Sequence, residues 1–184
     1  MILSHPPPPT FILSSTVQIS AISLLGGCTN CTSGRFSEIE AAESPSGCKG
    51  CPKGKWSSAI GVDKEARCHN CGAGKYGRTD FGGADSEASC TKCAPGKYLE
   101  TVGGVGSSLC KICPTGYYQP FDGQAFCLPC QPGSFSSTTE SSECVQCSVA
   151  RASTSVARVD DCDACSAGRH QPKTGMTTCL TCIP

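Results

Sequence analysis

Large apolar side chains are sparse in this chain and recur at an even spacing. Each lies two residues after a small residue, usually glycine, in a segment otherwise rich in Gly, Ser, Thr, Asp and Lys. A single large residue between turn-forming residues predicts short strands rather than helices. The recurring positions are Phe36, Trp56, Tyr76, Tyr98, Tyr118 and Phe135, followed in the same register by Ala152 and His170.

This pattern predicts two-stranded ribbons around residues 55–57, 75–77 and 97–99, and another short strand at residues 156–161. Residues 37–43 (SEIEAAE) predict one or two helical turns, and no long helix is expected. The expected fold class is therefore a set of small disulfide-rich repeats, an elongated array of short β-hairpins and loops with little helix.

Cysteine sets the repeat. The chain has 18 cysteines in 184 residues, and all of them fall into Cys-x-x-Cys pairs whose first cysteines are 17 to 22 residues apart. A fixed period of about twenty residues is typical of a repeat array. Three regions follow: a leader at residues 1–27, tandem repeats at residues 28–182, and the start of a further repeat at residues 183–184. The pairs are 28/31, 48/51, 68/71, 90/93, 110/113, 127/130, 144/147, 162/165 and 179/182.

A glycine follows most pairs at a fixed distance of three residues, and it predicts a turn with positive φ or a close chain approach. The aromatic residue two positions later is expected to pack on a neighbouring disulfide or repeat. A twenty-residue unit cannot bury a large core, so cross-links and stacking must replace one. The unit between Cys147 and Cys162 lacks both the glycine and the aromatic residue, and we expect it to be the least ordered.

Two disulfide patterns are compatible with the spacing. The favoured one joins the second cysteine of each pair to the first cysteine of the next, and each such loop contributes about 3 kcal/mol in the chain-entropy estimate. The other joins neighbouring pairs first to first and second to second, which leaves one of nine pairs unmatched. The sequential pattern predicts Cys31–Cys48, Cys51–Cys68, Cys71–Cys90, Cys93–Cys110, Cys113–Cys127, Cys130–Cys144, Cys147–Cys162 and Cys165–Cys179.

The alternative chemistry for the same cysteines is zinc binding. Pairs of Cys-x-x-Cys separated by 15 to 20 residues have a zinc-site spacing, and an intracellular multi-zinc protein is the competing interpretation. The later, shorter intervals and the odd number of pairs favour disulfides. Thiol–disulfide catalysis is disfavoured because no surrounding α/β pattern supports a reactive thiolate. We expect no catalytic, cofactor or metal site, and no enzyme.

Composition restricts the partners. Lys and Arg total 15 and Asp and Glu total 15, so no basic excess favours nucleic acid or anionic lipid. The leader has an apolar run but no preceding Lys or Arg, which makes it either a weak secretory signal or a disordered Pro/Ser-rich segment. A membrane would be reached only through segments outside this chain. Asn30-Cys31-Thr32 is an N-glycosylation sequon, although its cysteine is expected to be bridged.

The motif Cys-Pro-x-Gly-x-Tyr/Trp, followed by a Gly/Ser-rich loop and Cys-x-x-Cys, resembles the ephrin-receptor-like cysteine-rich repeat. It is also similar to the first loop of tumour-necrosis-factor-receptor modules. CPKGKW, CAPGKY and CPTGYY carry the resemblance best. It implies an extracellular or cell-surface, disulfide-laddered rod that acts as a spacer or binds protein ligands or neighbouring domains. The six-cysteine module of the tumour-necrosis-factor receptors is incomplete here, and no kinase domain is present in these residues.

Overall fold

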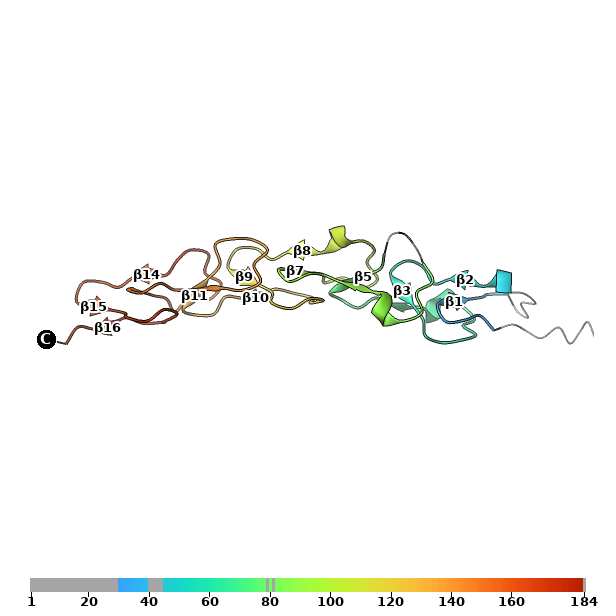
Figure 1. Ribbon diagram of the computed structural model, residues 1–184, viewed down its shortest axis with the longest axis horizontal. Helices are drawn as coiled ribbons and strands as arrows, with labels where there is room; N and C mark the ends of the chain where they lie inside the picture. Colours follow the sequence, from blue (N-terminus) through green and yellow to red (C-terminus); the bar gives the residue numbers. More distant parts are fainter. Residues whose placement is uncertain (1–29, 40–44, 79, 81, 184) are drawn as a thin grey trace, which may run out of the picture.

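The computed structural model describes residues 30–39, 45–78, 80 and 82–183. The leader at residues 1–27, Cys28 and residues 40–43 of the expected helical turn lie outside this described part. The described chain is an elongated array that runs end to end along its longest axis (Figure 1).

Eight antiparallel hairpins, each of two strands, follow one another along the array. Every strand has two residues, which confirms the expected short ribbons. No long helix is found in the described residues. The pairs are β1 (Arg35–Phe36) with β2 (Lys49–Gly50), β3 (Lys55–Trp56) with β4 (His69–Asn70), β5 (Lys75–Tyr76) with β6 (Thr91–Lys92), β7 (Lys97–Tyr98) with β8 (Lys111–Ile112), β9 (Tyr117–Tyr118) with β10 (Leu128–Pro129), β11 (Ser134–Phe135) with β12 (Val145–Gln146), β13 (Arg151–Ala152) with β14 (Asp163–Ala164), and β15 (Arg169–His170) with β16 (Leu180–Thr181).

Eight disulfides close the hairpins, and each joins the second cysteine of one pair to the first cysteine of the next. Their Cα–Cα separations run from 5.3 to 5.9 Å, within the ordinary range for a disulfide. We number the units by these bridges: unit 1, Cys31–Cys48; unit 2, Cys51–Cys68; unit 3, Cys71–Cys90; unit 4, Cys93–Cys110; unit 5, Cys113–Cys127; unit 6, Cys130–Cys144; unit 7, Cys147–Cys162; unit 8, Cys165–Cys179.

The second strand of each hairpin is formed by the two residues inside a Cys-x-x-Cys pair. In unit 2, Trp56 pairs with His69, which lies between Cys68 and Cys71. The second cysteine of the pair then donates its N–H to the turn residue of the finished unit, as Cys71 does to the Gly54 carbonyl at 2.8 Å. A Cys-x-x-Cys pair is therefore the junction where one unit ends and the next begins.

Two expected elements differ in the structure. Residues 156–161 form no strand, because Ala157 has a φ of 54° and its N–H bonds the Cys130 carbonyl of the preceding unit. No helix begins in the described residues 37–39; the helical content of the described chain is four 3₁₀ turns, one in each of units 1 to 4. These are η1 (Pro45–Gly47), η2 (Glu65–Arg67), η3 (Glu87–Ser89) and η4 (Ser107–Leu109).

The units are joined by backbone hydrogen bonds at all seven junctions. At each one, a loop residue of the later unit donates to the second-cysteine carbonyl of the earlier unit, as Gly61 does to Cys31 at 2.7 Å. The residue after each aromatic position also donates to the loop of the next unit, as Ser57 does to Ala84 at 3.0 Å. At six junctions there is a third bond, in which the N–H of the turn residue donates to a backbone carbonyl of the next unit. Each unit is therefore held by its neighbours as well as by its own disulfide.

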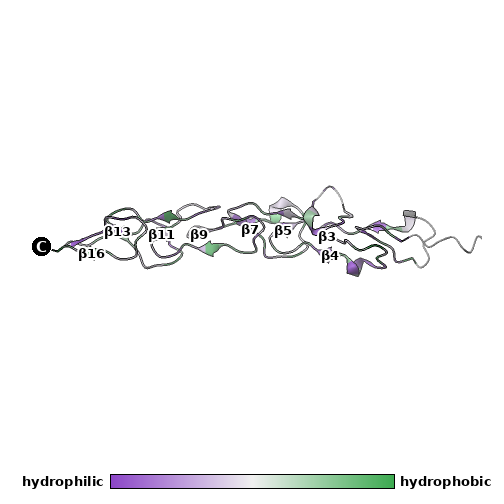
Figure 2. Ribbon diagram, turned by 60° about the horizontal axis from the view of Figure 1, so that its bottom comes forward, coloured by the Kyte–Doolittle hydropathy of each residue, from purple (hydrophilic) through white to green (hydrophobic). Residues whose placement is uncertain are grey.

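The buried interior is thin and consists mainly of cysteines. Figure 2 shows short hydrophobic patches separated by polar stretches along the array. One buried cluster joins two units: Phe36 of unit 1 packs with Val62 and the Cys51–Cys68 disulfide of unit 2. This is the expected packing of an aromatic residue on a neighbouring disulfide. Among the described residues no helix has the length and apolarity needed to cross a bilayer.

Candidate functional site

The turn glycines lie where three consecutive units meet. Gly74 has a φ of 80°, and a Cβ atom placed on it would overlap the backbone of Gly123, two units further along. The same overlap occurs in every unit from 1 to 6, so the glycine provides both the positive φ and the close approach that the sequence indicated. The turn residue and the loop residue that faces it are Gly34 with Gly83, Gly54 with Gly103, Gly74 with Gly123, Gly96 with Glu140, Gly116 with Ala157, and Gly133 with Gly175.

The residue after each aromatic position is a second structural position, and the sequence analysis missed it. It is buried in units 2 to 8 although its chemical type varies from glycine to glutamine. In unit 5, Gln119 is 2% exposed; its Nε2 donates to the Phe126 carbonyl at 2.8 Å and its Oε1 accepts from the Phe121 N–H at 3.1 Å. Gln171 makes the same two bonds in unit 8. The burial pattern of the fold reveals this position, because no single residue type is common to all the units.

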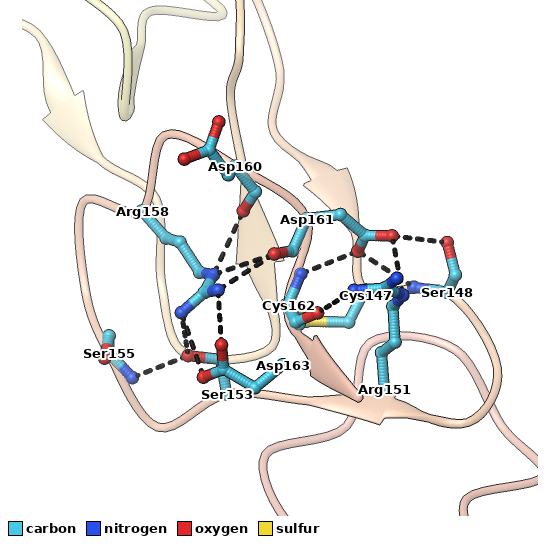
Figure 3. A network of polar contacts seen from close by, with 10 residues as sticks. All are labelled: Cys147, Ser148, Arg151, Ser153, Ser155, Arg158, Asp160, Asp161, Cys162 and Asp163. Atoms are coloured by element: carbon cyan, nitrogen blue, oxygen red, sulfur yellow. Dashed lines mark hydrogen bonds and ion pairs between the residues drawn. A yellow bond between two sulfur atoms is a disulfide. The ribbon is translucent and has the colours of Figure 1, made fainter. Parts of the chain in front are cut away.

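Unit 7 keeps its hairpin by a network of polar contacts (Figure 3). Arg158 donates to the Asp161 carbonyl at 2.9 Å and to the Asp163 carboxylate at 2.8 Å. Arg151 donates to the Cys162 carbonyl at 2.6 Å and pairs with the Asp161 carboxylate at 3.4 Å. These bonds lie in the unit that lacks the usual glycine and aromatic residue. We expected this unit to be the least ordered, but it has the same hairpin as its neighbours.

Asp161 is the carboxylate of this network whose pKa is shifted. Desolvation raises its pKa, but hydrogen bonds from the Cys162 N–H and from the hydroxyl and N–H of Ser148, together with the Arg151 charge, outweigh that effect and hold the pKa below its ordinary value. The ionised carboxylate is thus the form that unit 7 stabilises. Its role is structural, because every partner belongs to the same unit.

The exposed apolar side chains lie at loop tips rather than in one continuous patch. Ile60, Val102, Phe121 and Val156 are 57% to 71% exposed, each in the loop of a different unit. The variable loops at residues 79–84 and 102–107 are candidate contact loops, and residues 79 and 81 of the first loop lie outside the described chain. In the second loop, the 103–106 backbone bonds to unit 3, so Val102 and the residues after Gly106 form its outward part.

The cysteines and histidines show what chemistry the array holds. Of the 17 cysteines in the described residues, 16 form the eight disulfides and Cys182 is free and exposed. The described part has no group of three His, Cys, Asp or Glu residues placed to hold a metal ion. His69 instead packs against Trp56 with ring centroids 5.1 Å apart. Asn30 is exposed beside the bridged Cys31, and its glycosylation stays a prediction.

Comparison with known proteins identifies part of the array. Residues 101–147 match the family described as tyrosine-protein kinase ephrin type A/B receptor-like. This segment is similar to an ephrin-receptor-like cysteine-rich region. It contains the whole of units 5 and 6 and covers about a quarter of the chain. No curated protein matches the chain. The ephrin-receptor-like match and the extensive disulfide bonding fit an extracellular or secreted location.

Proposed function

We propose that this array is a non-catalytic extracellular spacer that holds loop tips apart for contact with protein partners. The main support is the continuous backbone bonding between units, which repeats at all seven junctions. In repeat proteins each unit contacts mainly its neighbours, and the stability of a junction decides whether the chain bends there. Here the turn of one unit also meets the loop two units away, which adds a further restraint on bending.

The ephrin-receptor-like segment supports the extracellular part of the proposal, since that family is a cysteine-rich ectodomain type. The contact role rests on the accessibility of the loop tips, where Ile60, Val102 and Phe121 are 57% to 71% exposed. Oppositely charged side chains pair along the surface, as Lys55 with Glu65 and Lys75 with Glu87. This leaves little long-range charge to attract a nucleic acid.

Stiffness is tested by a distance measurement across the array. Spectroscopic labels attached through unnatural amino acids at the exposed positions Ser58 and Thr139 avoid new cysteines. A spacer predicts one narrow distance distribution in the oxidised protein and a broad one after reduction. A broad distribution in the oxidised protein would overturn the spacer role. The same labels at Ser58 and Thr101 (unit 4), closer in sequence, control for label mobility.

The competing zinc interpretation is tested on the same protein. Non-reducing peptide mapping is expected to recover the eight sequential bridges, with no zinc retained after dialysis. Stoichiometric zinc, free thiols and unfolding on chelation would instead show an intracellular metal protein. The two results exclude each other because a bridged cysteine has no thiolate to offer a metal.

A further inference from the structure

The junction of units 7 and 8 differs from the others at one register position. Six units have an aromatic ring in the first strand, whereas unit 7 has Ala152 there. A surface hollow of about 320 Å³ lies beside Ala152 and is lined by Ser153, Ser166, Arg169, Thr178 and the Cys165–Cys179 disulfide, among other residues. The hollow therefore lies between the strand of unit 7 and the hairpin and disulfide of unit 8.

At two other junctions a ring of the protein itself lines the equivalent place. Phe36 packs on the disulfide of the following unit. Tyr118 borders a hollow formed with Gln131 and Ser134 of the following unit, which correspond in register to Ser166 and Arg169. The methyl group of Ala152 cannot extend over the next hairpin as these rings do. The hollow beside Tyr118 has nearly the same volume, about 330 Å³, as the one beside Ala152, but a ring of the chain lines the first hollow and no ring lines the second.

Charge supplies a second, independent argument. The basic residue that follows the turn is paired with a carboxylate in four units, through Lys55–Glu65, Lys75–Glu87, Lys97–Glu140 and Arg151–Asp161. Arg35 in unit 1 and Arg169 in unit 8 have the same position, but both are exposed and neither has an ion-pair partner among the described residues. Of the two, Arg169 lines the hollow. Asp163, the acidic residue of the hollow, is already held by Arg158 at 2.8 Å. The rim therefore has one uncompensated positive charge.

We propose that this hollow binds an aromatic side chain of a protein partner, with Arg169 pairing with a carboxylate next to that ring in the partner sequence. A guanidinium at the edge of the site offers bidentate bonding to the carboxylate and a flat cationic face to the ring. The proposal deepens the protein-contact part of the proposed function by naming the site and the partner chemistry.

The test uses the oxidised full chain, ¹⁵N-labelled, titrated with N-acetyl-Asp-Tyr-amide and followed by NMR. We expect amide shift changes concentrated at Ser153, Ser166 and Arg169. N-acetyl-Asp-Ala-amide and N-acetyl-Asn-Tyr-amide remove the ring and the charge in turn, and each is expected to bind about tenfold more weakly. Shift changes spread evenly over all eight units, or equal affinity for the three peptides, would overturn the proposal.

Two variants locate the site. Ala152→Tyr restores the residue type of the other units, so it is expected to fold with unchanged hairpin shifts and to lose at least about tenfold in affinity. Arg169→Gln is expected to weaken binding of the Asp-Tyr peptide but not of the Asn-Tyr peptide, whereas Lys173→Gln, in the neighbouring loop, leaves both unchanged. Equal losses at Arg169 and Lys173 would show a nonspecific charge effect and reject the site. The label-distance experiment measures only the stiffness of the array. If the peptides do not bind, the spacer role is therefore unaffected.

Discussion

The long units 1 to 4 and the short units 5 to 8 form the same hairpin, but different contacts stabilise their loops. The disulfides of the long units span 17 to 19 residues and those of the short units span 14 or 15. The extra residues of the long units form a 3₁₀ turn in each. In the short units this turn is absent, and hydrogen bonds from side chains such as Gln119 and Gln171 hold the loop.

The two regions also differ in how a unit meets its predecessor. In units 2 to 4, a residue after the loop glycine bridges to the strand end of the previous unit, as Val62 does to Phe36. Val62 is 4% exposed, and Cys68 beside it is 6% exposed. In unit 6 the corresponding Cys144 is half-buried. Both regions have the same backbone hydrogen bonds between units. The difference in loop length is therefore accommodated by the side chains that fill each loop.

The largest expected effect comes from removing a disulfide in each region. Replacing Cys51 and Cys68 by serine, or Cys130 and Cys144 by serine, is expected to remove a loop-closure contribution of about 3 kcal/mol in either case, because the loop lengths are similar. The first variant is expected to cost more, since its sulfurs pack with Phe36 and Val62. Native-state hydrogen exchange of the affected hairpins measures the difference. A larger loss in the short unit would contradict the packing argument.

The contact that joins the two regions is expected to have the next largest effect. Gly74 of a long unit lies against Gly123 of a short unit, and both Gly74 and Gly168 have a φ of 80°. Gly168→Ala adds only backbone strain of about 1–2 kcal/mol, because nothing lies within 4 Å of its added Cβ.

Gly74→Ala adds the same strain and an overlap with the Gly123 backbone, worth about 1–3 kcal/mol more. Chemical denaturation of the two variants, with hydrogen exchange to locate the opening, measures both costs. Equal destabilisation would show that the contact between units two apart contributes nothing.

The loop-holding role of the short units is tested at Gln119. Gln119→Leu removes two hydrogen bonds and leaves the Phe121 N–H and the Phe126 carbonyl to find other partners, at an expected cost of about 1–2 kcal/mol. Gln131→Leu is the matched control, because Gln131 is exposed and is expected to change stability by less than about 0.5 kcal/mol. Exchange of the Phe121 amide is the direct readout, and unchanged protection in Gln119→Leu would refute the role.

Much of this fold could be predicted from residues that repeat by type. The cysteine spacing indicates the unit, the glycines indicate the turns, and the aromatic residues mark the first strands. Positions defined by burial alone could not be found this way: Gln119, Ser136 and Leu99 share one place in the fold and no chemistry. The prediction of a strand at residues 156–161 was wrong because Ala157 has a positive φ. A positive φ at a residue other than glycine cannot be recognised from the sequence.

The hollow beside Ala152 illustrates the same limit at the candidate binding site. The sequence showed that unit 7 lacks its glycine and aromatic residue, and this was interpreted as a loss of order. The structure has the same hairpin there, with Arg158 bonded to three aspartates, Asp160, Asp161 and Asp163. A missing ring is visible in sequence, but the unpaired Arg169 next to it appears only when distances are known.

The smallest expected effect is a pH dependence confined to unit 7. The pKa of Asp161 is lowered in the folded state, so its ionised form contributes stability that is fully present above its unfolded pKa of about 4 and is lost as pH falls through the folded pKa. The carboxylate lies at the surface and the disulfide still closes the loop, so the change is expected to be local and small. Hydrogen exchange of unit 7 between about pH 5 and pH 2, corrected for intrinsic rates, measures it.

Asp161→Asn is expected to remove this pH dependence, because the amide cannot ionise. Asp160→Asn is the matched control: the main-chain carbonyl of Asp160 accepts from Arg158, and its carboxylate has no hydrogen bond or ion pair among the described residues. Its variant should keep the wild-type profile. If both variants flatten the profile equally, the effect reflects net charge rather than the bonds at Asp161.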